Sequence, residues 1–130
     1  MTTTTQDKLK LGIGTKEAAK LEAKPVLITG VRVEMKKDKA GKEVGEMVIF
    51  ITKHPDKVEP VELDRVKFEK DQKVKVTGAW FNIDSDGLIP KQSALAIAMR
   101  FYNVKALEGF VGIQAQTSLD EKGYLAIKAY

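Results

Sequence analysis

The sequence predicts a mainly β domain in which five strands form a small Greek-key barrel, with one helix between the third and fourth strands. Three observations predict it. Five runs rich in β-branched and aromatic residues are separated by turns rich in Gly, Asp and Lys. One helix-forming stretch interrupts them. The apolar pattern of the first run changes phase at a glycine, as expected for a strand that bends to pair on both sides of a barrel.

Length and composition limit the classes of protein to consider. With 130 residues the chain is expected to form one domain with its own core. It has no cysteine, which excludes disulfides and thiolate chemistry and suits the cytoplasm. No apolar run is long enough to span a membrane. The net charge of +4 permits a polyanionic partner without requiring one, and abundant Lys and Glu with scarce His resemble a thermophile's composition.

The domain is expected to occupy residues 25–130, after a peripheral N-terminal arm of residues 1–24. The first residues of the arm are polar and predicted to be partly disordered. Thr15 is a suitable N-cap for a short helix over Lys16–Ala23, which is rich in Ala, Lys and Glu.

The first two strands are expected to form a hairpin. The first strand is predicted over Pro25–Met35, and its phase change at Gly30 is typical of a β-bulge. A polar turn with a glycine, Lys36–Lys42, follows it. The second strand, Val44–Thr52, is apolar on both parities and should be covered on both faces. His54 is expected to end it.

The third strand is predicted over Gln72–Phe81. A short edge strand over Val61–Val66 could precede it. Side chains alternate along a strand, so Trp80 shares a side with Val74 and Val76 and is expected in the core.

The helix is predicted over Ala94–Asn103, with Ser93 as its N-cap and a stop near Gly109. It is apolar nearly all round, and a helix without a polar face should be buried on more than one side. Either the N-terminal arm covers the second side, or a second subunit does. A homo-oligomer formed through the helix 94–103 is therefore expected.

The last two strands are predicted over Phe110–Ser118 and Tyr124–Tyr130, joined by the turn Asp120–Gly123. Alternation in the final strand gives an inward set and an outward set. The inward set is Leu125, Ile127 and Ala129, and the outward set is Tyr124, Ala126, Lys128 and Tyr130.

Lysines beside aromatic residues predict a surface for nucleic acid, because phosphates need cations and bases stack on flat rings. They lie at the tip of the first hairpin and on the outward faces of the third and fifth strands. The candidates are Lys36, Lys37, Lys39, Lys42, Lys73, Lys75, Thr77, Phe81, Tyr124, Lys128 and Tyr130. Solvation of a hairpin tip and protection of sheet edges account for the same lysines without a ligand, so both interpretations stay open.

The order β-β-β-α-β-β, the phase change at Gly30 and the helix after Ser93 together resemble the OB-fold single-stranded nucleic-acid-binding proteins, over Pro25–Tyr130. The resemblance implies a protein that binds single-stranded nucleic acid with low sequence specificity, DNA somewhat favoured over RNA, in a groove across the second and third strands. OB folds also bind proteins, so a protein-interaction or assembly module is the alternative.

No motif for catalysis or for a cofactor accompanies this pattern. Asn82–Ile89 resembles the first eight positions of an EF-hand loop, but Ser93 stands where the bidentate Glu should be, which favours a simple Asp/Gly turn. The sole histidine, His54, has no nucleophile or metal-ligand partner in the sequence pattern. The protein is therefore expected not to be an enzyme and to use no metal or cofactor.

Overall fold

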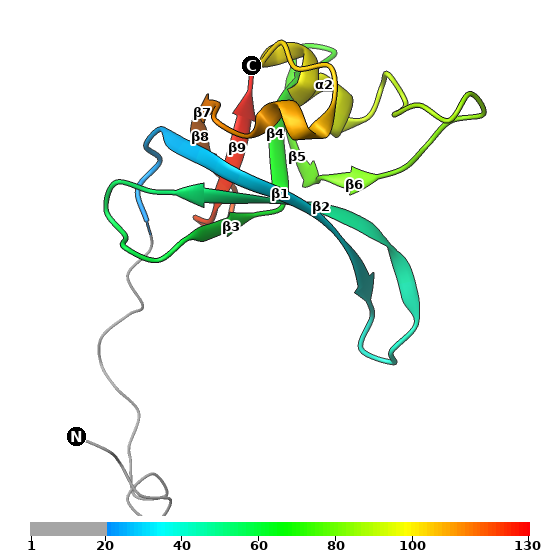
Figure 1. Ribbon diagram of the computed structural model, residues 1–130, viewed down its shortest axis with the longest axis horizontal. Helices are drawn as coiled ribbons and strands as arrows, with labels where there is room; N and C mark the ends of the chain where they lie inside the picture. Colours follow the sequence, from blue (N-terminus) through cyan, green and yellow to red (C-terminus); the bar gives the residue numbers. More distant parts are fainter. Residues whose placement is uncertain (1–20) are drawn as a thin grey trace, which may run out of the picture.

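The computed structural model describes residues 21–130 (Figure 1). Residues 1–20 of the predicted N-terminal arm, with most of the helix predicted over Lys16–Ala23, lie outside the described residues, and residues 21–25 form no regular element. The rest of the chain is mainly β, and the described part has a single α-helix. The predicted fold class is confirmed at this level.

A long antiparallel hairpin of β1 (Val26–Lys37) and β2 (Glu43–Lys53) dominates the structure. Its register shifts between Ile28 and Gly30, which confirms the bulge predicted from the phase change. Figure 1 shows both strands curving away from the body toward their turn. Near the body β2 is buried on both faces, as its doubly apolar sequence predicted.

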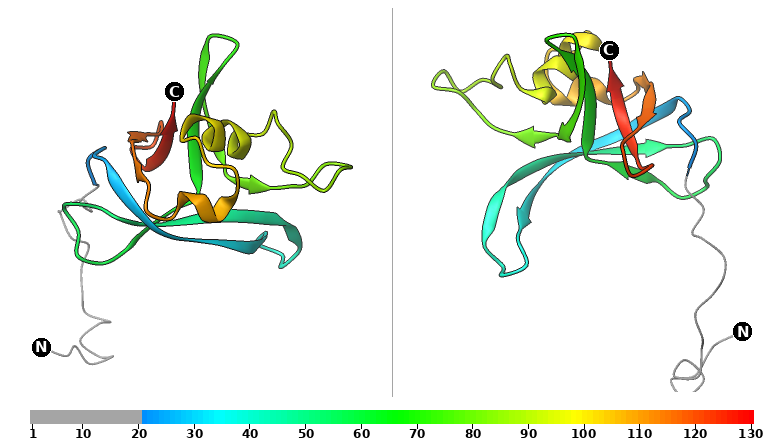
Figure 2. Two further views of the ribbon diagram at one scale, coloured as in Figure 1. Left: turned by 45° about the horizontal axis from the view of Figure 1, so that its top comes forward. Right: turned by 180° about the vertical axis from the view of Figure 1, so that it is seen from behind.

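Five further strands continue the pairing from β2 round to β1. They are β3 (Val61–Leu63), β4 (Arg65–Lys70), β7 (Gln114–Ala115), β8 (Thr117–Leu119) and β9 (Leu125–Ala129). β3 pairs with β2, β4 pairs with β9 in parallel, β8 pairs with β9, and β7 pairs with β1. Asp64 separates β3 from β4, and Gln116 separates β7 from β8. Because the chain passes from one sheet to the other at these two residues, the pairing closes into a circuit around the core (Figure 2).

The predicted third strand is wrong as a single element. It consists of β5 (Lys73–Gly78), which forms a hairpin with β4, and β6 (Trp80–Phe81), which pairs with β2. Ala79 lies between them and is fully buried. Its N–H donates to the carbonyl of Asp64 (2.8 Å), and its own carbonyl accepts from the N–H of Val48 (2.8 Å). The chain therefore leaves one sheet and joins the other at Ala79.

The segment Val61–Val66, predicted as a short edge strand, is also different. It comprises β3 and the start of β4, and β4 is a central strand between β5 and β9. Only Val66 and Phe68 are buried in β4, whose other residues are charged. A sequence this polar does not indicate a central strand, although β4 pairs with β5 on one edge and with β9 on the other.

The helix α2 (Ala94–Phe101) begins as predicted, because the Ser93 Oγ accepts a hydrogen bond from the N–H of Ala96 (3.1 Å). It ends two residues earlier than predicted, before Asn103 at a left-handed φ of 55°. Leu95, Ala96 and Ala98 are buried, whereas Phe101 is exposed. No second copy is described on this exposed side, so the oligomer formed through α2 stays a prediction. No helix of residues 21–130 is long and apolar enough to cross a membrane.

The short 3₁₀ helix η1 (Leu107–Phe110) replaces the start of the predicted fourth strand. Phe110 belongs to η1 and is fully buried. Its ring meets Phe50 and Tyr102 edge to face, with centroid distances of 5.1 and 6.3 Å. The apolar sequence from Phe110 predicts a strand, but Phe110 ends η1 instead, and its side chain is buried in the core.

Candidate nucleic-acid interface

Trp80 departs most from its expected position, because it is 38% exposed and not in the core. It pairs with Met47 across β6 and β2. An added Cβ at Gly45 would stand 3.4 Å from the indole carbons Cε3 and Cζ3, and one at Gly78 would stand 3.0 Å from Nε1. Two strand glycines therefore leave room for the indole to lie against the backbone. The alternation that predicted burial fails because Ala79 moves the chain to another sheet.

Strand register extends this surface to both sides of Trp80. Arg65 lies opposite Gly78, and Glu34 lies opposite Met47. Directly opposed residues point to the same side of a sheet. The next residue of β2, Val48, points into the core on the other side of the strand. Met47 is itself buried beneath Trp80, whereas Arg32, Glu34, Arg65 and Trp80 are exposed on this side. We call this surface the Trp80 face, and it comprises Arg32, Glu34, Gly45, Met47, Arg65, Gly78 and Trp80.

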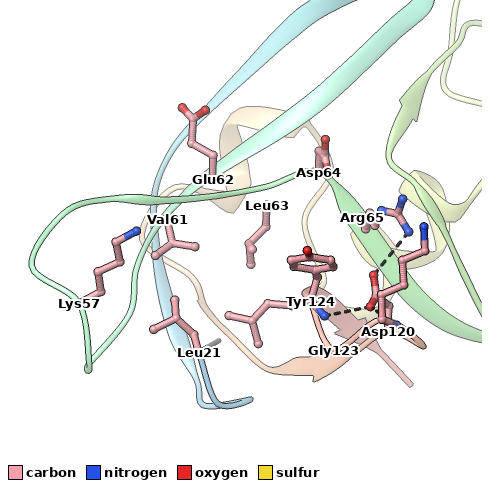
Figure 3. A pocket seen from close by; sticks show the side chains of 12 residues that line it. Leu21, Lys57, Val61, Glu62, Leu63, Asp64, Arg65, Asp120, Gly123 and Tyr124 are labelled. Atoms are coloured by element: carbon pink, nitrogen blue, oxygen red, sulfur yellow. Dashed lines mark hydrogen bonds and ion pairs between the residues drawn. The ribbon is translucent and has the colours of Figure 1, made fainter. Parts of the chain in front are cut away.

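Beyond Arg65 the surface opens into a pocket of about 530 Å³ between β3, the start of β4 and the turn before β9. Its apolar lining includes Leu63 and Tyr124, and the tyrosine is exposed. Figure 3 shows Lys57 and Arg65 on opposite sides of the pocket. The ring lies between two cationic side chains, an arrangement that can take a base together with its phosphates, and the carboxylates of Glu62, Asp64 and Asp120 also line the pocket. We call it the Tyr124 pocket.

Asp120 ties Arg65 to the backbone of Tyr124. Its Oδ1 accepts hydrogen bonds from the N–H groups of Tyr124 and Lys122 (2.9 Å each), and its Oδ2 lies 3.5 Å from Arg65 Nη1. The Asp120 side chain is only 5% exposed. These contacts lower the pKa of the Asp120 carboxyl, chiefly through the Tyr124 N–H and then through Lys122 N–H and the Arg65 charge.

Neutralising Asp120 should therefore remove a stabilising contribution that depends on pH. A carboxyl whose pKa is lower in the folded state stabilises the fold above its unfolded pKa, and this contribution is lost as the pH falls through the folded value. Asp120→Asn should melt below the wild type near neutral pH, and the difference should narrow below about pH 4. Melting temperatures across this range measure it. Glu121→Gln, the adjacent control, should show no such gap, and a pH-independent gap for Asp120→Asn would contradict the role of its charge.

At the other end of the Trp80 face lies the turn of the first hairpin, which is rich in lysine. Asp38 Oδ1 shapes this turn by accepting hydrogen bonds from the N–H groups of Ala40 and Lys42 (2.9 Å each). We call its four lysines, Lys36, Lys37, Lys39 and Lys42, the lysine hairpin. Within residues 21–130, Lys36 is the only one of the four that forms an ion pair, with its Nζ 3.5 Å from Glu34. The other three are exposed and available to phosphates.

The middle of the Trp80 face is close to neutral. The Arg32 guanidinium donates to both carboxylate oxygens of Glu62, with Nη2 2.8 Å from Oε1, and lies 3.6 Å from Glu34. The hydrogen bond to Glu62 raises the pKa of Arg32 and lowers that of Glu62. Because two carboxylates already accompany Arg32, the cations better placed to meet a polyanion lie at the two ends of the face, where Arg65 has Asp120 alone as an ion-pair partner among residues 21–130.

The structure separates the other predicted site residues. Phe81, predicted to point outward, is half-buried and packs against the core. Lys73, Lys75 and Thr77 are exposed on β5. Lys128 lies over the ring of Tyr130, with Nζ 4.8 Å from its centroid. The residues of β5 and Lys128 of β9 belong to one four-stranded sheet, β5-β4-β9-β8, so they lie apart from the lysine hairpin.

Sequence reasoning missed Trp80 and Arg65 as site residues. The signal for Trp80 was present in Gly45 and Gly78, because a glycine inside a strand often marks a close approach of another group. Arg65 belongs to a strand that was itself misread. Both side chains join one surface only through the register of strands distant in sequence.

Two other candidate sites are occupied by structural hydrogen bonds. His54 is buried after the end of β2, where its Nδ1 accepts from the Asp56 N–H (3.0 Å) and its Nε2 donates to the Glu22 carbonyl (2.8 Å). In the EF-hand-like turn, Asp84 Oδ1 accepts from the N–H groups of Asp86 (2.9 Å) and Leu88 (3.0 Å), as in an ordinary Asp/Gly turn. Residues 21–130 contain no group of three His, Cys, Asp or Glu that could hold a metal ion.

Comparison with protein-family models, with curated proteins and with solved structures gives no match to this chain. Function must therefore be inferred from the geometry of the Trp80 face.

Proposed function

We propose that the chain is an OB-fold protein that binds single-stranded nucleic acid, preferentially DNA, with little sequence specificity. The observation that carries this proposal is the half-exposed indole of Trp80, held against two strand glycines between the lysine hairpin and the Tyr124 pocket. A flat ring on an open sheet surface suits any base, since every base has a π face.

The strand circuit supports the OB assignment. If β3 with β4 and β7 with β8 each count as one bent strand, and β5 and β6 are set aside, five strands remain, and the helix lies between the third and fourth. In OB folds the face of strands two and three, with the loops 1–2 and 4–5, binds oligonucleotides. Here those loops correspond to the lysine hairpin and the turn Asp120–Gly123, which flank the Trp80 face. On this assignment β5 and β6 are an addition before the helix.

The distribution of charge determines how a strand would bind. Bases stack on Trp80 and Tyr124, while phosphates meet the lysine hairpin at one end and Arg65 with Lys57 at the other. The compensated Arg32 contributes little to phosphate binding. We therefore expect stacking to supply much of the affinity and the number of phosphate contacts to be small.

Intrinsic fluorescence tests this proposal directly, because Trp80 is the only tryptophan of the chain. Titration with oligo-dT should quench it, and the logarithm of the binding constant should fall by about 0.7 per phosphate contact for each unit of log salt. The triple variant Lys37→Ala, Lys39→Ala, Lys42→Ala should reduce that slope by about 2 while quenching persists at low salt.

Duplex DNA of the same length is the matched ligand control and should bind more weakly. If neither quenching nor a change in polarisation of labelled oligo-dT occurs at low salt, the nucleic-acid proposal is overturned. The protein-interaction module then becomes the better interpretation of the same surface.

A further inference from the structure

β1 has an edge that no described strand covers over much of its length. One edge pairs with β2 along the whole hairpin, whereas β7 reaches only Val26 and Leu27 on the other. Backbone hydrogen bonds from the segment before β7 extend this contact to Ile28. From Gly30 to Lys36 the second edge has no strand partner among residues 21–130. η1 lies against β1, and Figures 1 and 2 show the end of β1 nearer the hairpin turn projecting beyond the body. Unpaired N–H and C=O groups on such an edge are a template for another strand.

The free stretch has defined limits and a defined centre. The register of β1 is irregular between Ile28 and Gly30 and again between Lys36 and Lys37. Between these two irregularities the strand is regular, and the midpoint of the run is Val33. A strand that pairs with a copy of itself does so antiparallel about a two-fold axis, so its midpoint is the natural position of that axis.

We propose that Gly30–Lys36 pairs antiparallel with the same stretch of a second copy, about a two-fold axis at Val33, and joins two chains into a homodimer. In this register Arg32 lies opposite Glu34 of the second copy, and the same pair occurs again across the axis. An axis at Glu34 would oppose two glutamates, and an axis at Arg32 would oppose two arginines. Opposite charges directly across a ladder stabilise it and like charges destabilise it, so the charges select the axis at Val33.

The apolar side of the same stretch agrees with this register. Val33 is 39% and Met35 42% exposed, on the side of β1 opposite to Arg32 and Glu34. The axis at Val33 places Val33 beside its own copy and Met35 beside Val31 of the second copy. Exposed apolar surface is thus covered by apolar surface. Arg32 and Glu34 are already in contact at 3.6 Å, which limits the side-chain entropy lost when they pair across the axis.

The dimer has a consequence for the surface described above, although it does not depend on the proposed function. The two-fold axis is perpendicular to the joined sheet, because Arg32 and Glu34 of both copies then lie on one side. Both Trp80 faces therefore lie on the same side of one continuous sheet.

Cysteine cross-linking tests the interface and its register, because the chain has no native cysteine. Residues opposed across an antiparallel ladder have Cα atoms about 5 Å apart, within the range of a disulfide. Val33→Cys should give a disulfide dimer on mild oxidation. Val31→Cys and Met35→Cys should each fail alone, and the double variant should succeed. Phe101→Cys, on the exposed side of α2, is the matched control and should cross-link only if the helix forms the contact.

Light scattering without nucleic acid gives the second measurement. The wild type should have twice the chain mass of 14.4 kDa. Glu34→Lys replaces two attractive pairs by two repulsive pairs and should raise the dimer dissociation constant by about tenfold or more. Glu59→Lys makes the same change of charge in a loop and should leave it unchanged. A monomeric wild type, or Val33→Cys cross-linking no faster than Phe101→Cys, would overturn the proposal.

Discussion

Replacing Trp80 with alanine should weaken the binding of oligo-dT by about tenfold to a hundredfold. Loss of one stacked base costs roughly 1–3 kcal/mol, and the near-neutral centre of the Trp80 face offers no cation to compensate. Anisotropy of a fluorescently labelled oligonucleotide measures the change, since the variant has no tryptophan fluorescence. The salt slope should stay close to that of the wild type, because no phosphate contact is removed.

Two matched variants separate stacking from a structural effect. Trp80→Phe keeps a flat ring over Gly45 and should retain most of the affinity. Phe101→Ala removes an exposed aromatic ring of α2 outside the Trp80 face and should retain all of it. If Trp80→Ala binds like the wild type while the triple lysine variant loses affinity, the interface is electrostatic, and the indole serves only to cover Met47.

The elements that sequence reasoning located correctly are those whose signal is local. The alternation expected in β9 is not among them, because Ala126, expected to point outward, is fully buried. The bulge at Gly30, the hairpin after it and the N-cap Ser93 are each encoded within a few residues. Turn residues, caps and periodicity act over such short distances.

The third strand could not be located in the same way. β4 buries only Val66 and Phe68, so its charged sequence resembles a solvated segment, while the more apolar β5 is the edge strand. The break at Ala79 is set by hydrogen bonds to Asp64 and Val48, which lie far from it in sequence. Tertiary pairing here overrides local preference.

The same distinction between local signals and tertiary pairing applies to the residues of the candidate site. The lysine hairpin and Tyr124 were predicted because turns and strand ends expose their residues. Trp80 and Arg65 were missed, because their common surface depends on which strands lie side by side. Phe81 was expected on the outward face of the third strand and Trp80 in the core, but the break at Ala79 exchanges their sides relative to the core.

The largest effect on stability should come from Phe110→Ala, which we expect to lower the free energy of unfolding by about 3–5 kcal/mol. Phe110 is fully buried and contacts Phe50 and Tyr102 through its ring. Its loss leaves a cavity and removes two edge-to-face contacts. Most small domains have a free energy of unfolding of only about 5–15 kcal/mol, so the variant should lose a large part of its stability. Equilibrium unfolding in urea measures the change.

The position of Phe110 makes this more than a test of one core residue. η1 joins α2 to β7, and β7 closes the strand circuit by pairing with β1. Phe110→Leu keeps an apolar side chain of moderate size and should cost clearly less than alanine. Val111→Ala, at the exposed next position, should cost little. A loss below about 1 kcal/mol for Phe110→Ala would mean that η1 is not anchored in the core, and closure of the circuit through β7 would then lack its main apolar support.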